Sequence, residues 1–142
     1  MNTLFTINYW TVLAAAIASM IVGALWYSPL ILGRPWVRLM GFTGEAMEKA
    51  KEQNMALPYS LSFLGLLVMS YVIAHILQYA GVRNAAQAIQ IAFWLWIGFI
   101  APSLATGFLW TIKKKPFSLY LIDNGHWLAV LMVQGLILTF WS

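Results

Sequence analysis

Four long runs of apolar residues, separated by short connections, constrain this chain more than any other feature of its sequence. A helix that crosses the hydrocarbon core of a membrane needs about 20 mostly apolar residues. The sequence therefore predicts an all-α integral membrane protein with four transmembrane helices. The predicted spans are about 7–32, 58–80, 87–110 and 117–141, with loops at 33–57 and 111–116, in one membrane domain over 1–142.

The composition agrees with this class and excludes several kinds of site. Only 8% of the residues are charged and 62% are hydrophobic, whereas a soluble domain carries about 25% charged residues. The absence of cysteine excludes disulfides, thiolate metal ligands and cysteine nucleophiles. No sequence motif for a nucleophile elbow, a phosphate loop or a zinc site occurs. We therefore predict no metal, no cofactor and no catalytic residue, and an enzyme is the less favoured class.

The basic residues indicate the orientation of the chain. They lie in the connections between apolar runs rather than on one polar face, so the net charge of +4 does not indicate nucleic-acid binding. Lys and Arg in short loops stay on the cytoplasmic side of a membrane. One side carries a single basic residue, Arg83, so both termini are predicted to lie outside the cytoplasm. The other side carries Arg34, Arg38, Lys49, Lys51, Lys113, Lys114 and Lys115.

The loop over 33–57 is the largest segment predicted outside the bilayer. Its first part, residues 33–40, mixes proline, tryptophan and arginine as an amphipathic interfacial segment does. A second short helix is predicted after Thr43, a suitable N-cap, with an i,i+4 pair between Glu45 and Lys49. The loop is interpreted as a connector on the membrane surface, with a regulatory or partner-docking role as the alternative.

Small residues spaced one helical turn apart predict how the helices pack. Helices in lipid associate by close packing, which favours small side chains at the contact. Ala15, Ser19 and Gly23 form such a seam on the first span. The spacing does not distinguish contact within one chain from contact between copies. A homo-oligomer is predicted, because four spans with short loops make a small bundle.

Polar residues within the third and fourth spans predict a polar layer inside the membrane. Asp123 lies about 9 Å beyond Phe117 along a helix, and His126 shares its helix face. An ionisable group inside a span is a functional-site hypothesis by default. The alternative is that these groups hydrogen-bond to one another and hold the helices together. Pro102 and Asn124 are compatible both with continuous helices and with helices broken at these two positions.

The chain resembles a known family at several short strings. They are Gly23-Ala24-Leu25-Trp26-Tyr27-Ser28-Pro29, Arg34-Pro35-Trp36, Leu39-Met40-Gly41-Phe42-Thr43, Gly98-Phe99-Ile100-Ala101-Pro102 and Asn124-Gly125-His126. These strings are similar to those of small bacterial four-span membrane proteins known only as the domain of unknown function numbered seventeen sixty-one. The resemblance covers essentially the whole chain. It implies a bacterial inner-membrane location and four spans, and it implies no activity.

The leading hypothesis is a protein that binds or passes a small molecule, a lipid or an ion at the polar layer. A membrane enzyme acting on a lipid-soluble substrate, with Asp123 and His126 as acid and base, is the second hypothesis. A structural or accessory membrane subunit is the third. The candidate ligand-binding residues are Trp26, Tyr27, Ser28, Pro102, Ser103, Thr106, Asp123, Asn124 and His126.

Overall fold

The computed structural model describes residues 6–112 and 114–141, and within these residues it is all helical. Lys113, one of the predicted loop cations, lies outside the described residues. The elements are α1 (Tyr9–Trp26), α2 (Gly33–Met40), α3 (Gly44–Lys51), α4 (Ala56–Tyr79), α5 (Ala85–Leu95), the π-helical turn η1 (Trp96–Ile100), α6 (Ala101–Leu109) and α7 (Phe117–Phe140).

Four of these helical stretches are long and apolar enough to cross a membrane. They are α1, α4, α7 and the continuous stretch Ala85–Leu109, which contains α5, η1 and α6. The prediction of an all-α chain with four membrane-spanning helices is therefore confirmed. The first helix ends at Trp26, whereas the apolar run continues to Leu32.

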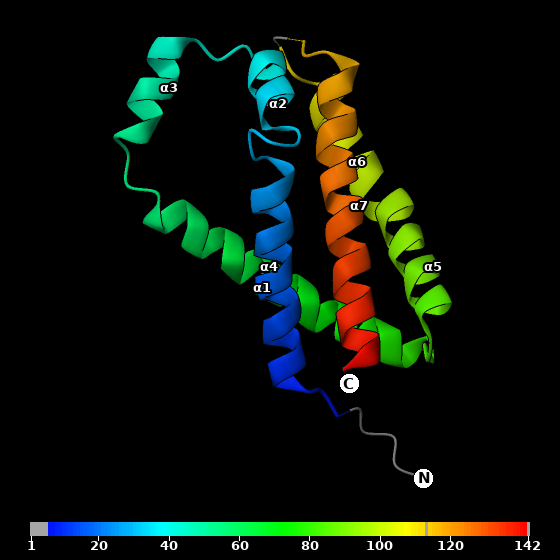
Figure 1. Ribbon diagram of the computed structural model, residues 1–142. Helices are drawn as coiled ribbons and strands as arrows, with labels where there is room; N and C mark the ends of the chain where they lie inside the picture. Colours follow the sequence, from blue (N-terminus) through cyan, green and yellow to red (C-terminus); the bar gives the residue numbers. More distant parts are fainter. Residues whose placement is uncertain (1–5, 113, 142) are drawn as a thin grey trace.

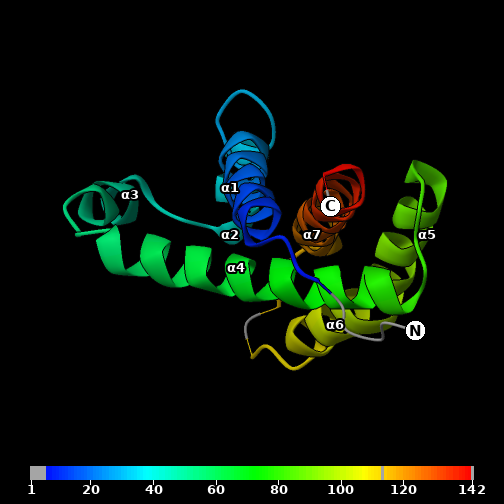
Figure 2. The ribbon, with the colours of Figure 1, turned by 90° about the horizontal axis from the view of Figure 1, so that it is seen from below.

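Helix α7 is the centre of the bundle. It lies beside α1, runs antiparallel to it (Figure 1), and contacts α1, α4 and α5. Seen from below, α1 and α7 are viewed nearly end-on, whereas α4 extends across the view and passes both of them (Figure 2). The crossing of α1 and α4 is close because the side chains at the contact are small. Ser70 of α4 is fully buried and donates a hydrogen bond to the carbonyl of Val12, 2.9 Å away.

The predicted seam on α1 packs against other helices of the same chain. Ala15 and Ser19 are buried in the bundle, and the Ser19 hydroxyl donates to the carbonyl of Ala15 at 2.8 Å. A hydroxyl that bonds to its own helix leaves a nearly apolar surface, which lets another helix approach. These residues therefore pack the helices of one copy, and assembly of several copies stays a prediction.

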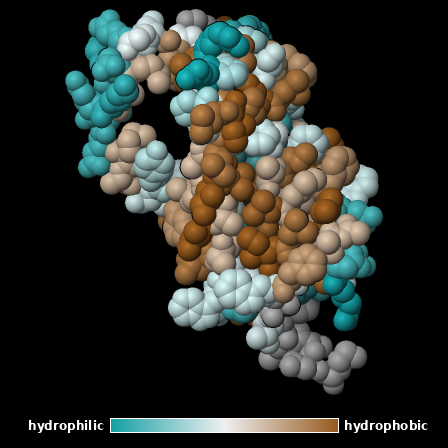
Figure 3. Space-filling view, in the orientation of Figure 1, coloured by the Kyte–Doolittle hydropathy of each residue, from teal (hydrophilic) through white to brown (hydrophobic). Residues whose placement is uncertain are grey.

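The connections between the helices lie at the two opposite ends of the bundle. The C-terminus, the start of α1 and the connection between α4 and α5 lie at one end, and α2 and the connection between α6 and α7 lie at the other (Figure 1). On the surface, hydrophobic residues form a broad band across the middle, and hydrophilic residues gather around α2 and α3 (Figure 3). The basic connections thus share one end of the molecule, as the sequence predicts.

A tight turn over residues 27–32 separates α1 from α2. The N–H of Gly33 donates to the carbonyl of Ser28 at 2.8 Å, and a Cβ at Gly33 would lie 2.3 Å from the carbonyl oxygen of Tyr27. Only glycine fits such a close backbone approach. The turn places α2 against the start of α7, which it contacts. The predicted amphipathic segment at 33–40 is thus a short helix folded onto the end of the bundle.

The short helix α3 forms where the sequence predicts it. Thr43 is its N-cap and accepts a hydrogen bond from the N–H of Ala46 at 3.1 Å. Lys49 and Glu45 lie 3.8 Å apart, with both side chains mostly exposed. No residue of α3 is buried, so packing against the bundle contributes little to its stability.

The structure answers differently at the two positions where the sequence left a break open, Pro102 and Asn124. The third span contains the π-helical turn η1 immediately before α6, where the N–H of Ala101 donates to the carbonyl of Trp96. Pro102 has no N–H to give to the preceding turn, and the Ser103 hydroxyl donates to the carbonyl of Phe99 at 2.5 Å. Helix α7, by contrast, is continuous through Asn124.

Candidate functional site

The end of α1 is joined to α7 by two side-chain hydrogen bonds. The hydroxyl of Tyr27 donates to Oδ1 of Asp123 at 2.6 Å, and the indole N–H of Trp26 donates to the carbonyl of Ile122 at 3.0 Å. Both contacts are partly buried. The Trp-Tyr pair at the end of α1 is therefore held against the first two turns of α7, where Asp123 lies.

Two glycines allow this close approach. A Cβ added at Gly125 would lie 2.8 Å from Cζ2 of Trp26, which is closer than side-chain atoms approach each other. A Cβ added at Gly23 would lie 3.2 Å from Nε2 of His126. The indole of Trp26 thus lies against α7 where Gly125 has no side chain, and the imidazole of His126 lies against α1 where Gly23 has none.

Aromatic rings continue from this junction in both directions. The Tyr27 ring lies 5.1 Å from the His126 ring and 5.5 Å from the Trp36 ring. His126 contacts Trp127 at 4.9 Å, and Trp36 contacts Phe42 at 5.7 Å. Five rings from α1, α2, α7 and the connection after α2 therefore form one chain. We call Tyr27, Asp123 and His126, with the rings of Trp36 and Trp127, the junction cluster.

The junction cluster contains polar atoms that have no hydrogen-bond partner among the described residues. Over residues 6–112 and 114–141, no hydrogen bond reaches the second carboxylate oxygen of Asp123 or either imidazole nitrogen of His126. The ion pairs among those residues lie on α3, so no Lys or Arg that the structure describes pairs with Asp123. Asp123 and His126 are both half-buried, so these atoms border the surface rather than the closed core.

Asn124 lies next to Asp123 in sequence but belongs to a different contact. Its side chain is 2% exposed and its amide N–H donates to the carbonyl of Tyr120 at 2.9 Å. Its Oδ1 is buried without a partner. The indole N–H of Trp96 in η1 donates to the Asn124 carbonyl at 2.9 Å. Asn124 therefore helps to join α7 to the third span and does not line the junction cluster.

Trp96 is a residue that sequence reasoning missed. The chain has eight tryptophans, and nothing in the sequence shows which indole N–H meets a neighbouring helix. Tyr120 acts in a similar way, since its hydroxyl donates to the carbonyl of Ala101 at 2.8 Å. These two bonds attach α7 to the first residue of the π-helical turn, Trp96, and to the residue that follows the turn, Ala101.

The remaining predicted site residues do not join the cluster. The Ser103 and Thr106 hydroxyls donate to the carbonyls of Phe99 and Pro102, four residues before each of them. Pro102, Ser103 and Thr106 are all exposed. Ser28 bonds to the carbonyl of Leu25. The structure thus places Tyr27 in contact with both Asp123 and His126, and Trp26 beside them against the adjoining turn of α7.

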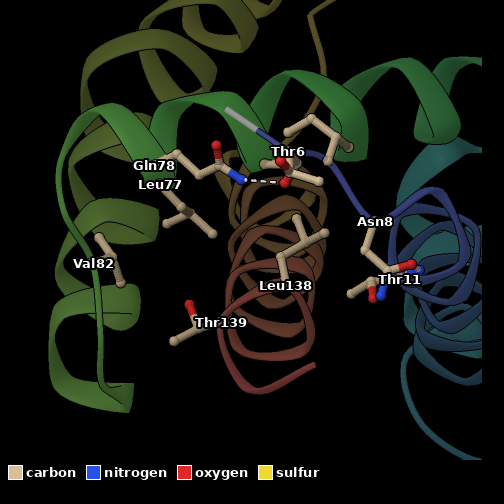
Figure 4. A pocket seen from close by; sticks show the side chains of 10 residues that line it. Thr6, Asn8, Thr11, Leu77, Gln78, Val82, Leu138 and Thr139 are labelled. Atoms are coloured by element: carbon tan, nitrogen blue, oxygen red, sulfur yellow. Dashed lines mark hydrogen bonds between the residues drawn. The ribbon is translucent and has the colours of Figure 1, made fainter. Parts of the chain in front are cut away.

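A cavity of about 180 Å³ lies at the opposite end of the bundle. Figure 4 shows its walls, with Gln78 donating a hydrogen bond from α4 to the carbonyl of Thr6 at 2.9 Å, and Thr139 coming from α7. Gln78 Oε1 and Thr139 Oγ1 are buried without partners. The cavity carries no charged residue among the side chains that line it, so it differs in chemistry from the junction cluster.

Comparison with known proteins gives one match. Residues 10–139 match the family model described as protein of unknown function (DUF1761). The chain belongs to this family. No curated protein matches the chain, and no solved structure matches it. The matched segment includes every residue of the junction cluster. The resemblance noted from the sequence is therefore confirmed.

Proposed function

We propose that this DUF1761 protein binds a small amphiphilic molecule with a cationic amine at the junction cluster, within the membrane. The observation that carries the proposal is the carboxylate of Asp123, which accepts one hydrogen bond from Tyr27 and has no cationic partner among the described residues. A charged group inside a membrane helix is costly unless it is paired. A bound amine would supply the missing charge.

The rings around Asp123 favour the same class of ligand. Tyr27, Trp36 and His126 lie within 5.5 Å of one another along the chain of rings. An ammonium group is attracted to the faces of aromatic rings, by about 0.5–2 kcal/mol for each favourable contact. A carboxylate next to aromatic rings is the combination that selects a cation over a neutral molecule of the same shape. The unbonded nitrogens of His126 add a further hydrogen-bonding position.

The packing beyond the cluster supports binding rather than passage. Val130, Leu131 and Gln134 of α7 are buried at 4% exposure or less, and they occupy the centre of the bundle between the cluster and the opposite end. A ligand at Asp123 would therefore enter and leave by the same side. The exposed apolar surface of the helices suits entry of an amphiphile from the lipid.

We propose that both termini face outward from the cytoplasm of a bacterial inner membrane. The support is that α2 and the connection between α6 and α7 lie at one end of the bundle (Figure 1), since basic loops remain cytoplasmic. Helix α2 carries Arg34 and Arg38, and the connection carries Lys115. In that orientation the junction cluster lies in the cytoplasmic half of the membrane. Cysteine accessibility in intact cells tests the orientation, because the chain has no native cysteine.

The binding experiment uses tetraphenylphosphonium, an apolar monovalent cation, with the purified protein in nanodiscs and with empty nanodiscs subtracted. Asp123→Asn should weaken binding at least tenfold. Glu52→Gln is the matched control, because it makes the same chemical change at an exposed position at the end of α3, and it should bind as the wild type does. Tyr27→Phe should bind at least as tightly, because the carboxylate then loses its internal donor.

Two results would overturn the proposal. The first is a wild-type protein that does not bind the cation above the empty nanodisc. The second is equal binding by Asp123→Asn and Glu52→Gln. If either occurs while Asp123→Asn and Tyr27→Phe both lower the free energy of unfolding, then Asp123 serves to hold α1 against α7, as the structural alternative requires.

A further inference from the structure

The end of the bundle that carries α2 has basic side chains without acidic partners. On α3, Lys49 and Lys51 lie 3.8 Å and 3.5 Å from Glu45 and Glu48. Elsewhere in the described residues, no carboxylate lies within ion-pair distance of Arg34, Arg38, Lys114 or Lys115. The positive charge of α3 is thus balanced locally, whereas that of α2 and the α6–α7 connection is not.

Tertiary structure joins these two segments. The ammonium of Lys115 donates to the carbonyl of Met40, the last residue of α2, at 2.7 Å. Arg38 lies two residues before Met40, and Arg34 lies one turn earlier on the same face. Both arginines are exposed. Lys115, which is far from the two arginines in sequence, is thereby held at the end of the short helix that carries them.

The opposite side of α2 is fixed to the bundle. Trp36 is half-buried and its ring lies 5.5 Å from that of Tyr27. Trp36 is two residues from each arginine, so it lies on the opposite side of α2, and its contact with Tyr27 leaves Arg34 and Arg38 on the exposed side of the helix. In the space-filling view the hydrophilic surface at α2 adjoins the hydrophobic band of the spans (Figure 3). A position at the edge of an apolar band is where the phosphates of a bilayer lie.

We propose that Arg34, Arg38 and Lys115 bind the phosphate of an anionic phospholipid at the membrane surface. Guanidinium groups match phosphate oxygens with two parallel N–H donors, and phospholipid is the phosphate source that a membrane-bound site meets first. The proposal is independent of the junction cluster, because it concerns other side chains and a ligand of opposite charge.

The test measures which lipids remain with the purified protein. Nanodiscs contain equal amounts of dioleoyl-phosphatidylglycerol and dioleoyl-phosphatidylcholine, and lipid retained after extraction into mild detergent is counted by mass spectrometry. A basic residue near an anionic lipid surface contributes about a fivefold preference. Arg34→Gln/Arg38→Gln should therefore lower the phosphatidylglycerol preference about 25-fold. The control Lys49→Gln/Lys51→Gln removes the same charge from α3 and should retain the wild-type preference.

The wild-type protein also tests the proposal, whatever the variants do. Its preference for phosphatidylglycerol should fall as salt rises, because exposed charges are screened. A wild type without preference, or equal losses in the two double variants, would overturn a site on α2. Displacement of the lipid by inorganic phosphate alone would show that the site takes free phosphate, and would overturn the assignment to lipid.

Discussion

The close contact between Trp26 and Gly125 predicts that Gly125→Ala destabilises the protein. Gly125→Ala adds a Cβ that would lie 2.8 Å from Cζ2 of Trp26, whereas carbon atoms in good contact lie about 3.5–4.0 Å apart. One of the two groups must move by close to 1 Å. The indole resists that movement, because its N–H is bonded to the Ile122 carbonyl at 3.0 Å.

Three contributions set the size of the change in the free energy of unfolding caused by Gly125→Ala. Forcing an extra methyl into a packed contact costs about 1–3 kcal/mol, and weakening the indole hydrogen bond costs about 1 kcal/mol. Alanine is favoured over glycine inside a helix by about 1 kcal/mol. The sum is a destabilisation of about 1–3 kcal/mol.

Gly107→Ala is the matched control, because Gly107 lies inside α6 and a Cβ there meets nothing within 4 Å. The same change should therefore raise the free energy of unfolding by up to about 1 kcal/mol. Gly125→Ala should therefore lower the free energy of unfolding, whereas Gly107→Ala should raise it. The measurement is a titration of unfolding with a denaturing detergent in mixed micelles, followed by circular dichroism.

A double-mutant cycle tests whether the loss of stability in Gly125→Ala comes from contact with the Trp26 indole. Trp26→Leu removes the crowding ring, so Gly125→Ala should cost much less in that background than in the wild type. The reasoning is refuted if Gly125→Ala is as harmless as Gly107→Ala, or if Trp26→Leu leaves the cost of Gly125→Ala unchanged.

Two further substitutions test contacts at either end of α7. Trp96→Phe removes the indole donor to the Asn124 carbonyl, and should lower the free energy of unfolding by about 0.6–1.7 kcal/mol in the same titration; an unchanged value would mean that this bond does not hold η1 to α7. Thr139→Val replaces a buried hydroxyl without a partner, and should raise the free energy of unfolding by about 1 kcal/mol. A loss of stability instead would indicate that the Thr139 hydroxyl has a partner in the membrane-embedded protein.

The features that the sequence predicts well are those with a local physical cause. Apolar runs of membrane-spanning length predict the four spans, and Thr43 predicts the start of α3 because its hydroxyl caps the helix that follows it. Asp123 and His126 are recognisable as a pair because a charge within a span is rare and the two are one turn apart. Trp26-Tyr27-Ser28-Pro29 at the end of α1 is an unusual string, and it is the most specific of the strings that carry the resemblance to the family.

The rotation of each span about its axis was decided only by tertiary structure. In a soluble helix, the apolar face marks the side that packs inward, but here the residues facing lipid are as apolar as those facing the core. Leu109 and Phe99 are 61% and 69% exposed, although nothing in the sequence separates them from buried neighbours. For this reason the predicted polar layer included Ser103 and Thr106, which the structure turns outward.

A hydroxyl in a membrane helix can also be satisfied by its own preceding turn, so its presence does not imply a partner on another helix. Ser103 and Thr106 do this, whereas the carboxylate of Asp123 cannot accept from a turn whose N–H groups are already bonded, and it meets Tyr27 of α1. The sequence by itself thus determined which segments are long and apolar enough to cross a membrane and which of them holds a carboxyl group. The packing of α1 and α2 on α7 decided which side chains surround that carboxyl group, because only close contact between helices selects one rotation among faces of equal hydrophobicity.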